Sequence, residues 1–238
     1  MKLMQLKYEL DELDTVQQLQ HLADIFSGKI VFSTSFGWED QVITHLIFSN
    51  NIPIKVFTLE TGRLFPETYY VWNRTLEVYN KPIHAYFPQT LAVQEMVNAK
   101  GPNSFYESAE NRKECCYIRK IEPLKRALAG NELWITGIRA EQSTNRDDME
   151  NLEWDDGNQI VKFHPIFNWS LDEVKNYIKT NNIIYNTLHD KGFPSIGCAP
   201  CTRAVQPGED FRAGRWWWED QSKKECGLHE LKATSAER

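Results

Sequence analysis

The distribution of apolar and polar residues predicts a chain of alternating strands and helices. Short apolar runs typical of buried strands are Lys29–Ser33, Ile54–Leu59, Ile83–Phe87 and Leu133–Ile138. Apolar residues at helical spacing predict helices at 13–26, Glu39–Ser49, Pro66–Tyr79, Leu91–Ala99 and Cys115–Leu128. A further helix is expected to begin at Ser170, because Ser170 and Glu173 have the spacing of a capping box.

Strands that are buried on both faces and separated by helices predict an α/β fold, a mainly parallel sheet with helices on both faces. In such sheets ligands bind at the carboxyl ends of the strands, in the loops that lead into helices. Three loops of this kind carry polar residues, namely Ser33–Gly37, Glu60–Arg63 and Arg139–Arg146. We expect one domain over residues 1–238, with an α/β core at 1–205 and a mobile C-terminal segment at 206–238.

The composition is that of an ordinary globular protein, with 41% hydrophobic and 25% charged residues and a net charge of −6. An acidic chain has no general attraction for nucleic acid or anionic membrane, so an anionic ligand requires a local cluster of Arg and Lys. The sequence shows no signal peptide and no run of membrane-spanning length. We therefore expect a cytoplasmic protein with reduced thiols, and leave open whether it forms a homo-oligomer.

The loop Ser33-Thr-Ser-Phe-Gly37 lies between a predicted strand and a predicted helix. Small residues allow backbone N–H groups to approach an anion, and the helix N-terminus adds a favourable dipole. The loop is not a Walker A motif, because it lacks G-K-[ST]. The sequence of this loop alone is equally compatible with a polar turn that caps the helix.

The five cysteines divide into two close pairs, Cys115-Cys116 and Cys198-x-x-Cys201, and a single Cys226. Adjacent helical residues point about 100° apart, so Cys115 and Cys116 can hold different corners of one bulky group. Four thiolates are the usual ligands of a [4Fe–4S] cluster, whereas one zinc ion needs sulfurs that converge on a single point. The tandem pair favours a cluster, and a zinc site or unconnected free cysteines are the alternatives.

Several motifs resemble those of the assimilatory adenylyl-sulfate (APS) reductases. These enzymes are iron–sulfur members of the 3′-phospho-APS (PAPS)/APS reductase family, within the pyrophosphate-loop adenine-nucleotide enzymes. The matching segments are 33–37, 58–63, 115–124, 137–143, 169–174, 198–202 and 225–229. Both cysteine pairs together with 225–229 (ECGLH) are highly specific, and the resemblance extends from about residue 28 to the end of the chain. One departure is Glu60, which stands where the family motif has Asp.

The resemblance implies a Rossmann-like fold of the adenine nucleotide alpha hydrolase type and an enzyme of sulfate assimilation that reduces APS to sulfite and AMP. It implies that Cys226 is the nucleophile, that thioredoxin or glutaredoxin is the electron donor, and that Cys115, Cys116, Cys198 and Cys201 hold the cluster. The substrate-binding residues that we expect from it are Ser33, Ser35, Phe36, Gly37, Thr61, Gly62, Arg63, Lys120, Arg139, Arg212, Arg215 and His229.

Three other functions are also compatible with the sequence. A reductase that accepts both APS and PAPS is the nearest, since some cluster-bearing relatives do so. A pyrophosphate-loop ligase or tRNA-thiolating enzyme is less compatible, because the S-T-S-F-G loop lacks the aspartate of the S-G-G-x-D-S motif. The last is a zinc-stabilised interaction module in which Cys226 is an exposed tail cysteine without a role.

Overall fold

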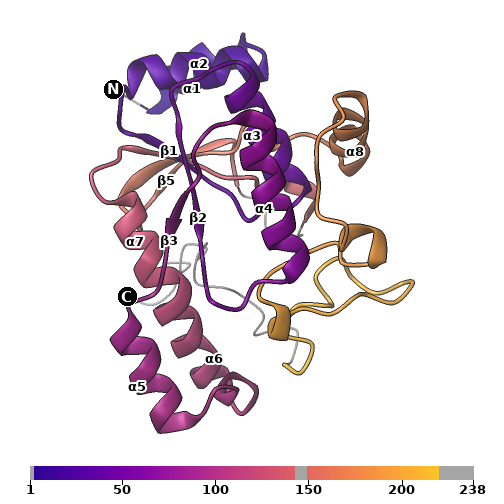
Figure 1. The fold of residues 1–238 in the computed structure, drawn as a ribbon. Coiled ribbons are helices and arrows are strands. Elements are labelled where there is room, and N and C mark those ends of the chain that lie inside the picture. Colours follow the sequence, from indigo (N-terminus) through magenta and orange to yellow (C-terminus); the bar gives the residue numbers. More distant parts are fainter. Residues whose placement is uncertain (1–2, 143–148, 220–238) are drawn as a thin grey trace, which may run out of the picture.

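The computed structural model describes residues 3–142 and 149–219, and these form a six-stranded sheet with helices on both faces (Figure 1). The strand order is β3-β2-β1-β4-β6-β5. Every neighbouring pair is parallel except the edge pair β5–β6. The strands are β1 (Ile30–Ser33), β2 (Lys55–Leu59), β3 (His84–Tyr86), β4 (Leu133–Ile135), β5 (Leu152–Asp155) and β6 (Ile160–Phe163). The predicted mainly parallel α/β sheet is confirmed.

Alternating strand residues pack against two separate layers of helices. Phe32, Ile135 and Phe163 face a large core that is closed by helices α1 to α4 and by α8. Val31 and Trp134 face the opposite layer, which is closed by α7. The helices are α1 (Leu3–Asp11), α2 (Thr15–Ile25), α3 (Trp38–Ser49), α4 (Pro66–Tyr79), α5 (Thr90–Lys100), α6 (Ala109–Cys116), α7 (Glu122–Leu128) and α8 (Leu171–Thr180).

Local sequence signals explain where several helices begin. Pro66 occupies the first turn of α4, where its missing N–H costs no hydrogen bond. The capping box at the start of α8 is present as predicted, with the Ser170 side chain accepting from the Glu173 backbone and the Glu173 side chain accepting in return. Among the described residues, no helix is both long and apolar enough to cross a membrane.

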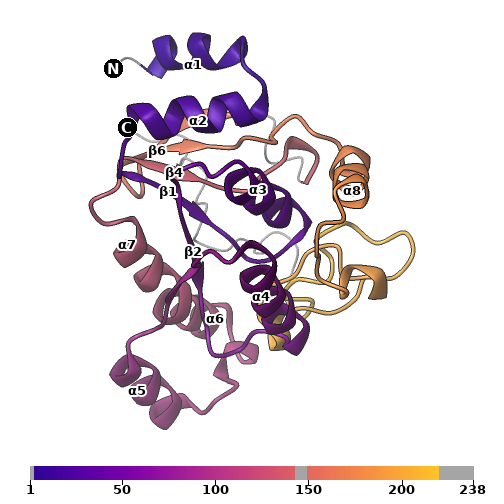
Figure 2. The same ribbon diagram turned by 45° about the horizontal axis from the view of Figure 1, so that its top comes forward.

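The sequence pattern did not predict α1 or the antiparallel hairpin β5–β6. Helix α1 buries only Leu6 and Leu10, so its apolar face is narrow. Strand β6 carries Lys162, which is 4% exposed and lies 2.6 Å from Asp155 of β5. A charged residue within a short strand hides the apolar run that identifies the other strands. Figure 2 shows β6 and β4 beside β1, with α1 and α2 at that end of the sheet.

Candidate active site

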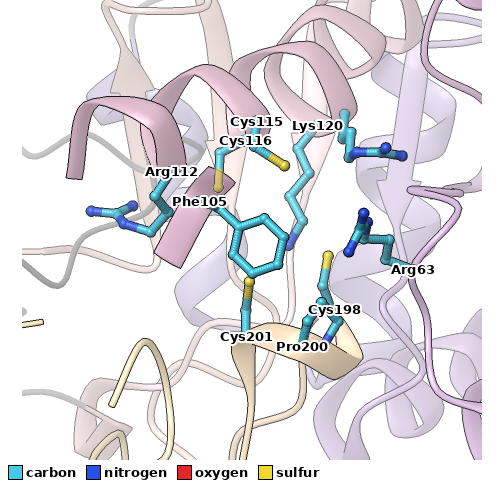
Figure 3. Close-up of a pocket in the computed structure, with 10 residues that line it drawn as sticks. Arg63, Phe105, Arg112, Cys115, Cys116, Lys120, Cys198, Pro200 and Cys201 are labelled. Carbon is cyan, nitrogen blue, oxygen red and sulfur yellow. The ribbon is translucent and has the colours of Figure 1, made fainter. Parts of the chain in front are cut away.

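Both cysteine pairs line one pocket at the end of helix α6 (Figure 3). Cys115 and Cys116 come from the last turn of α6, Cys198 is the N-cap of the short helix η6 (Ala199–Cys201), and Cys201 is its last residue. The other lining residues are Arg63, Phe105, Arg112, Arg119, Lys120 and Pro200. Residues more than 80 positions apart in the sequence therefore meet at one place that is rich in both sulfur and positive charge.

The helix that carries Cys115 and Cys116 changes its winding directly after them. Residues Tyr117–Ile121 form a π-helical turn, η2, which joins α6 to α7. Such turns occur frequently at functional sites, because the extra residue changes the direction of the side chains that follow. Lys120 lies within this turn and its side chain reaches into the pocket between the two cysteine pairs (Figure 3). The sequence predicted one continuous helix over Cys115–Leu128, and the structure interrupts it with this turn.

The loop after β2 connects the two cysteine pairs. The Thr61 hydroxyl lies 3.3 Å from the Cys198 sulfur, and the Thr61 carbonyl accepts a 2.6 Å hydrogen bond from Arg119. Gly62 has a φ of +71°, and a Cβ there would come within 3.3 Å of the Arg119 guanidinium. The backbone carbonyl of Arg63 accepts from the Ala199 N–H at 2.8 Å. The predicted Thr-Gly-Arg loop thus forms a wall of the cysteine pocket.

Two thiols of this pocket, Cys115 and Cys201, are unfavourable sites for negative charge. Burial raises the pKa of Cys115. Burial, and then the nearby Cys198, raise the pKa of Cys201 to about 12. A bound cation would offset this cost, since metal ligation requires the thiolate form. In the described part of the chain, no three His, Cys, Asp or Glu side chains are arranged to hold a single metal ion. Four sulfurs around a pocket, rather than at one point, match the separate corners of an iron–sulfur cluster.

The Ser33–Gly37 loop follows β1 as predicted, and its donors contact a carboxylate of the same chain. The Ser35 N–H and hydroxyl both donate to Asp40 at 2.6 Å. Asp40 is buried, and this burial raises its pKa to about 6 in spite of the two hydrogen bonds. Phe36 adopts a φ of +63° and is fully buried against Trp72. The loop can therefore bind an oxyanion oxygen, but here Asp40 supplies that oxygen.

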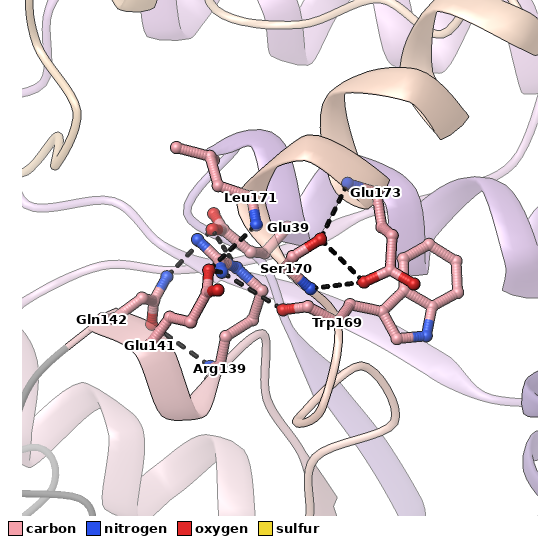
Figure 4. A network of polar contacts seen from close by, with 8 residues as sticks. All are labelled: Glu39, Arg139, Glu141, Gln142, Trp169, Ser170, Leu171 and Glu173. Atoms are coloured by element: carbon pink, nitrogen blue, oxygen red, sulfur yellow. Dashed lines mark hydrogen bonds and ion pairs between the residues drawn. The ribbon is translucent and has the colours of Figure 1, made fainter.

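Arg139 lies at the neighbouring strand end and is held by two carboxylates (Figure 4). Its Nε donates to Glu39 at 2.9 Å, and its Nη1 lies 2.9 Å from Glu141. Gln142 also donates to Glu39 at 2.9 Å. Arg139 is 1% exposed, so its guanidinium is solvated by these protein groups rather than by water. Its predicted contact with a nucleotide stays a prediction.

Of the remaining predicted residues, the structure describes Arg212 and Arg215 but does not describe Cys226 and His229. Arg215 is buried beside Ser195, and a Cβ on Gly197 would lie 2.3 Å from its guanidinium. Arg212 is half-buried on the turn that precedes it. Cys226 and His229 lie outside the described residues, so the structure does not place the predicted nucleophile.

The family of the chain follows from comparison with known proteins. The phosphoadenosine phosphosulfate reductase domain matches residues 29–204, which include both cysteine pairs and all three strand-end loops. The chain belongs to the phosphoadenosine phosphosulfate (PAPS) reductase family.

Curated members of the PAPS reductase family resemble the chain over most of its length. The adenosine 5′-phosphosulfate reductase of Allochromatium vinosum is 50% identical over 200 residues, which is 84% of this chain and 78% of that protein. The protein of the same name from Rhizobium meliloti is 46% identical over 228 residues, 96% of this chain and 86% of that protein.

Solved structures place the PAPS reductase fold in a wider class. A crystal structure of the PAPS reductase from Candida auris in complex with phosphate has a TM-score of 0.71 at 28% identity, covering 85% of this chain and 96% of that one. Yeast FAD synthetase has a TM-score of 0.55 at 16% identity, covering 80% of this chain and 64% of that one. The latter shows fold alone, and the predicted fold of the adenine nucleotide alpha hydrolase type is confirmed.

Sequence reasoning missed two arginines of this PAPS reductase family site. Arg112 and Arg119 are 1% and 7% exposed and both line the cysteine pocket. Paired charges such as Arg119-Lys120 usually lie on a solvated helix face, but the cysteines directly before them argue against that here. The available signal was spacing, because Arg112 and Arg119 lie three or four residues from Cys115 or Cys116 and so share a face of the helix with one of them.

Proposed function

We propose that the chain is an adenosine 5′-phosphosulfate reductase that forms sulfite and AMP with a dithiol protein as reductant. The observation that carries the proposal is the meeting of Cys115-Cys116 and Cys198-Cys201 around the side chain of Lys120. A cation next to this sulfur-lined pocket suits a substrate whose reacting group is the anionic sulfo end of a phosphate–sulfate anhydride. The names of the curated relatives support the same substrate.

In the first step, the Cys226 thiolate attacks the sulfur of APS. A new S–S bond forms, the bond between that sulfur and the phosphate oxygen breaks, and AMP leaves with the electron pair. The product on the enzyme is S-sulfocysteine, Cys–S–SO₃⁻. Lys120 and Arg215 are proposed to hold the sulfate oxygens, because cations around an oxyanion can fix its sulfur in line with the nucleophile.

In the second step, a thiolate of thioredoxin or glutaredoxin attacks the Cys226 sulfur. Sulfite leaves with the electron pair of the broken S–S bond, and a mixed disulfide remains. The second thiol of the reductant resolves it, which restores the Cys226 thiol and leaves the reductant oxidised by two electrons. Thioredoxin, with a potential of about −270 mV, is a suitable donor. Because all four described cysteines are free thiols, we propose a reducing compartment, the cytoplasm.

We propose that the four cysteines of the pocket hold a [4Fe–4S] cluster. The donor set fits, since four thiols line one pocket and burial raises the pKa of two of them, Cys115 and Cys201. When bound, the cluster supplies iron that neutralises these thiolates and ties the two cysteine pairs together. Arg119 would hold the Thr61 loop against the same pocket, and Thr61 would donate to the Cys198 sulfur.

Turnover with defined substrates tests the proposed function. Protein purified without oxygen is incubated with APS, thioredoxin and a thioredoxin-reducing system, and sulfite and AMP are measured together. We expect equal amounts of both products. ATP-dependent release of pyrophosphate without sulfite would instead identify a pyrophosphate-loop ligase.

A reductase of dual specificity is the second candidate, because the matching family domain and a structural neighbour are named for PAPS whereas the curated relatives are named for APS. APS and PAPS are offered in competition, and the two rates of nucleotide release are compared. We expect APS to be used preferentially. Equal efficiency with the two substrates would overturn the preference for APS and leave the reductase activity in place.

A further inference from the structure

A buried ion pair joins the described part of the C-terminal segment to helix α6, the helix that carries Cys115 and Cys116. Arg112 of α6 donates from Nε to Glu219 Oε1 at 2.6 Å, and their side chains are 1% and 7% exposed. Arg112 also lines the pocket beside Cys116, which follows it by one helical turn. Glu219 is the last residue of the described segment that precedes Cys226.

Aromatic and backbone contacts support the same attachment. The Trp216 ring lies 4.7 Å from the Arg112 guanidinium and 4.9 Å from that of Arg215, and Trp216 is 1% exposed. The Trp216 N–H donates to the Cys201 carbonyl at 3.1 Å. Trp218 packs 4.5 Å from Tyr106. Removing either partner of the ion pair would leave a charge buried in this apolar setting, which is costly.

The ion pair limits where Cys226 can be. Six residues lie between positions 219 and 226, and the seven residue steps that join these positions reach at most about 25 Å. With Glu219 anchored on α6, the covalent chain keeps position 226 within that distance of the ion pair. Confinement of this kind raises the effective concentration of a nucleophile without any direct contact with the substrate.

We propose that Arg112 and Glu219 form a latch that holds the base of the C-terminal segment on helix α6 and thereby positions Cys226 for attack. Both are positioning residues, since they act through the segment rather than on the substrate. The effect on catalysis rests on the proposed function. The attachment itself does not, because it follows from the contacts of Arg112, Trp216 and Glu219.

The test uses Glu219→Gln, which removes the charge and keeps the shape of the side chain. The first readout is tryptic cleavage after Arg215, whose side chain is buried while the segment is attached. We expect cleavage to become about tenfold faster or more, because breaking a buried ion pair favours local opening. The matched control is Glu122→Gln, which removes an exposed Arg–Glu pair on α7 and should leave cleavage unchanged.

The second readout is the rate at which APS alone modifies Cys226 in a single turnover, with iron content and AMP affinity measured in parallel. We expect the rate to fall about tenfold or more while iron content and AMP affinity stay within about twofold. The rate should fall equally in Arg112→Met. In the double variant it should fall no further than in either single variant, since both substitutions remove the same interaction.

The outcomes separate the latch from the proposed function. Unchanged cleavage and an unchanged rate in Glu219→Gln would overturn the latch. Additive losses in the double variant would show that the two residues act separately, which also contradicts it. If the wild-type protein forms no adduct on Cys226, the proposed function fails, and tryptic cleavage after Arg215 alone decides whether the latch exists.

Discussion

At the scale of single residues, the fold buries or closely surrounds several charged side chains at the strand ends and the cysteine pocket. Lys120 lies among thiols, Arg139 lies between Glu39 and Glu141, and Asp40 is buried beneath the Ser35 loop. Such groups are expensive to bury and therefore indicate a site that is prepared for a charged ligand.

Replacement of Lys120 tests the oxyanion site directly. Lys120→Ala should weaken binding of APS, with a loss of about 1–3 kcal/mol for a hydrogen bond to a charged group. Iron content should not change, because Lys120 is not a proposed ligand. Lys125→Ala, on the exposed face of the same helical segment, is the control. Equal affinities for APS in Lys120→Ala and Lys125→Ala would exclude a contact between Lys120 and the substrate.

Asp40 predicts a pH dependence of stability. Its pKa is raised from 3.8 to about 6 by burial, so the folded state binds the proton more tightly than the unfolded state. The free energy of unfolding should therefore decrease as the pH rises from about 4 to about 6. Asp40→Asn should remove this decrease and gain up to about 2–3 kcal/mol at pH 7. Urea unfolding at several pH values between about 4 and 7 measures the free energy of unfolding of both proteins. Asp156→Asn, in the exposed β5–β6 turn, is the control. Parallel pH profiles for Asp40→Asn and the wild-type protein would contradict the assignment.

At the scale of elements, apolar runs predicted the central strands because β1, β2 and β4 are buried on both faces. The same reasoning could not predict the β5–β6 hairpin, since the buried Lys162 is neutralised by Asp155 from a strand that pairs with it only in the folded chain. The π-helical turn was also beyond reach, because hydrophobic spacing does not reveal one extra residue in a helical turn.

The candidate site was predictable to a similar degree. The cysteine pairs and the Thr61-Gly62-Arg63 loop were identified from spacing and resemblance, and the structure brings them together. The hydrogen bonds from Ser35 to Asp40 could not be predicted, because they depend on how deeply helix α3 buries the Asp40 carboxylate. Sequence identifies the residue types of a site, whereas burial decides which charges are already paired.

Gly137 at the end of β4 tests how closely the strand-end loops approach one another. A Cβ at this position would lie 2.3 Å from Asp40 Oδ1 and 3.2 Å from Glu39 Cβ. Gly137→Ala should therefore lower the free energy of unfolding by about 1–3 kcal/mol through overpacking. Gly157→Ala, whose Cβ would only reach ordinary contact at 3.4 Å from Asp155, should change it by about 0.5 kcal/mol or less. Denaturant unfolding measures both, and equal stabilities would mean that the loops separate easily.

At the scale of the whole molecule, the sheet brings together residues from distant parts of the chain. The loops after β1, β2 and β4 leave the same edge of the sheet because these strands are parallel. The described part of the C-terminal segment then packs beside the cysteine pocket through Trp216 and Trp218. The four cysteines proposed to hold the cluster therefore lie beside the described part of the segment that precedes the proposed nucleophile.

The separation of these functions predicts opposite results for two serine variants. Cys201→Ser should lose iron, because it removes one of four proposed ligands. Cys226→Ser should keep its iron and bind AMP like the wild-type protein, yet form no sulfite. Iron and sulfide analysis of protein purified without oxygen measures the first effect, and the thioredoxin-coupled assay measures the second. Full iron content in Cys201→Ser would show that the pocket does not hold the cluster through this sulfur.

The central claim is that Cys226 accepts the sulfo group beside an iron–sulfur site built by the other four cysteines. Mass spectrometry of the iron-loaded protein after incubation with APS and no reductant tests it most directly. We expect the mass of one sulfo group on the peptide that contains Cys226, and none in Cys226→Ser. Sulfite production by a protein that never carries this adduct, or an adduct on any other cysteine, would contradict the claim.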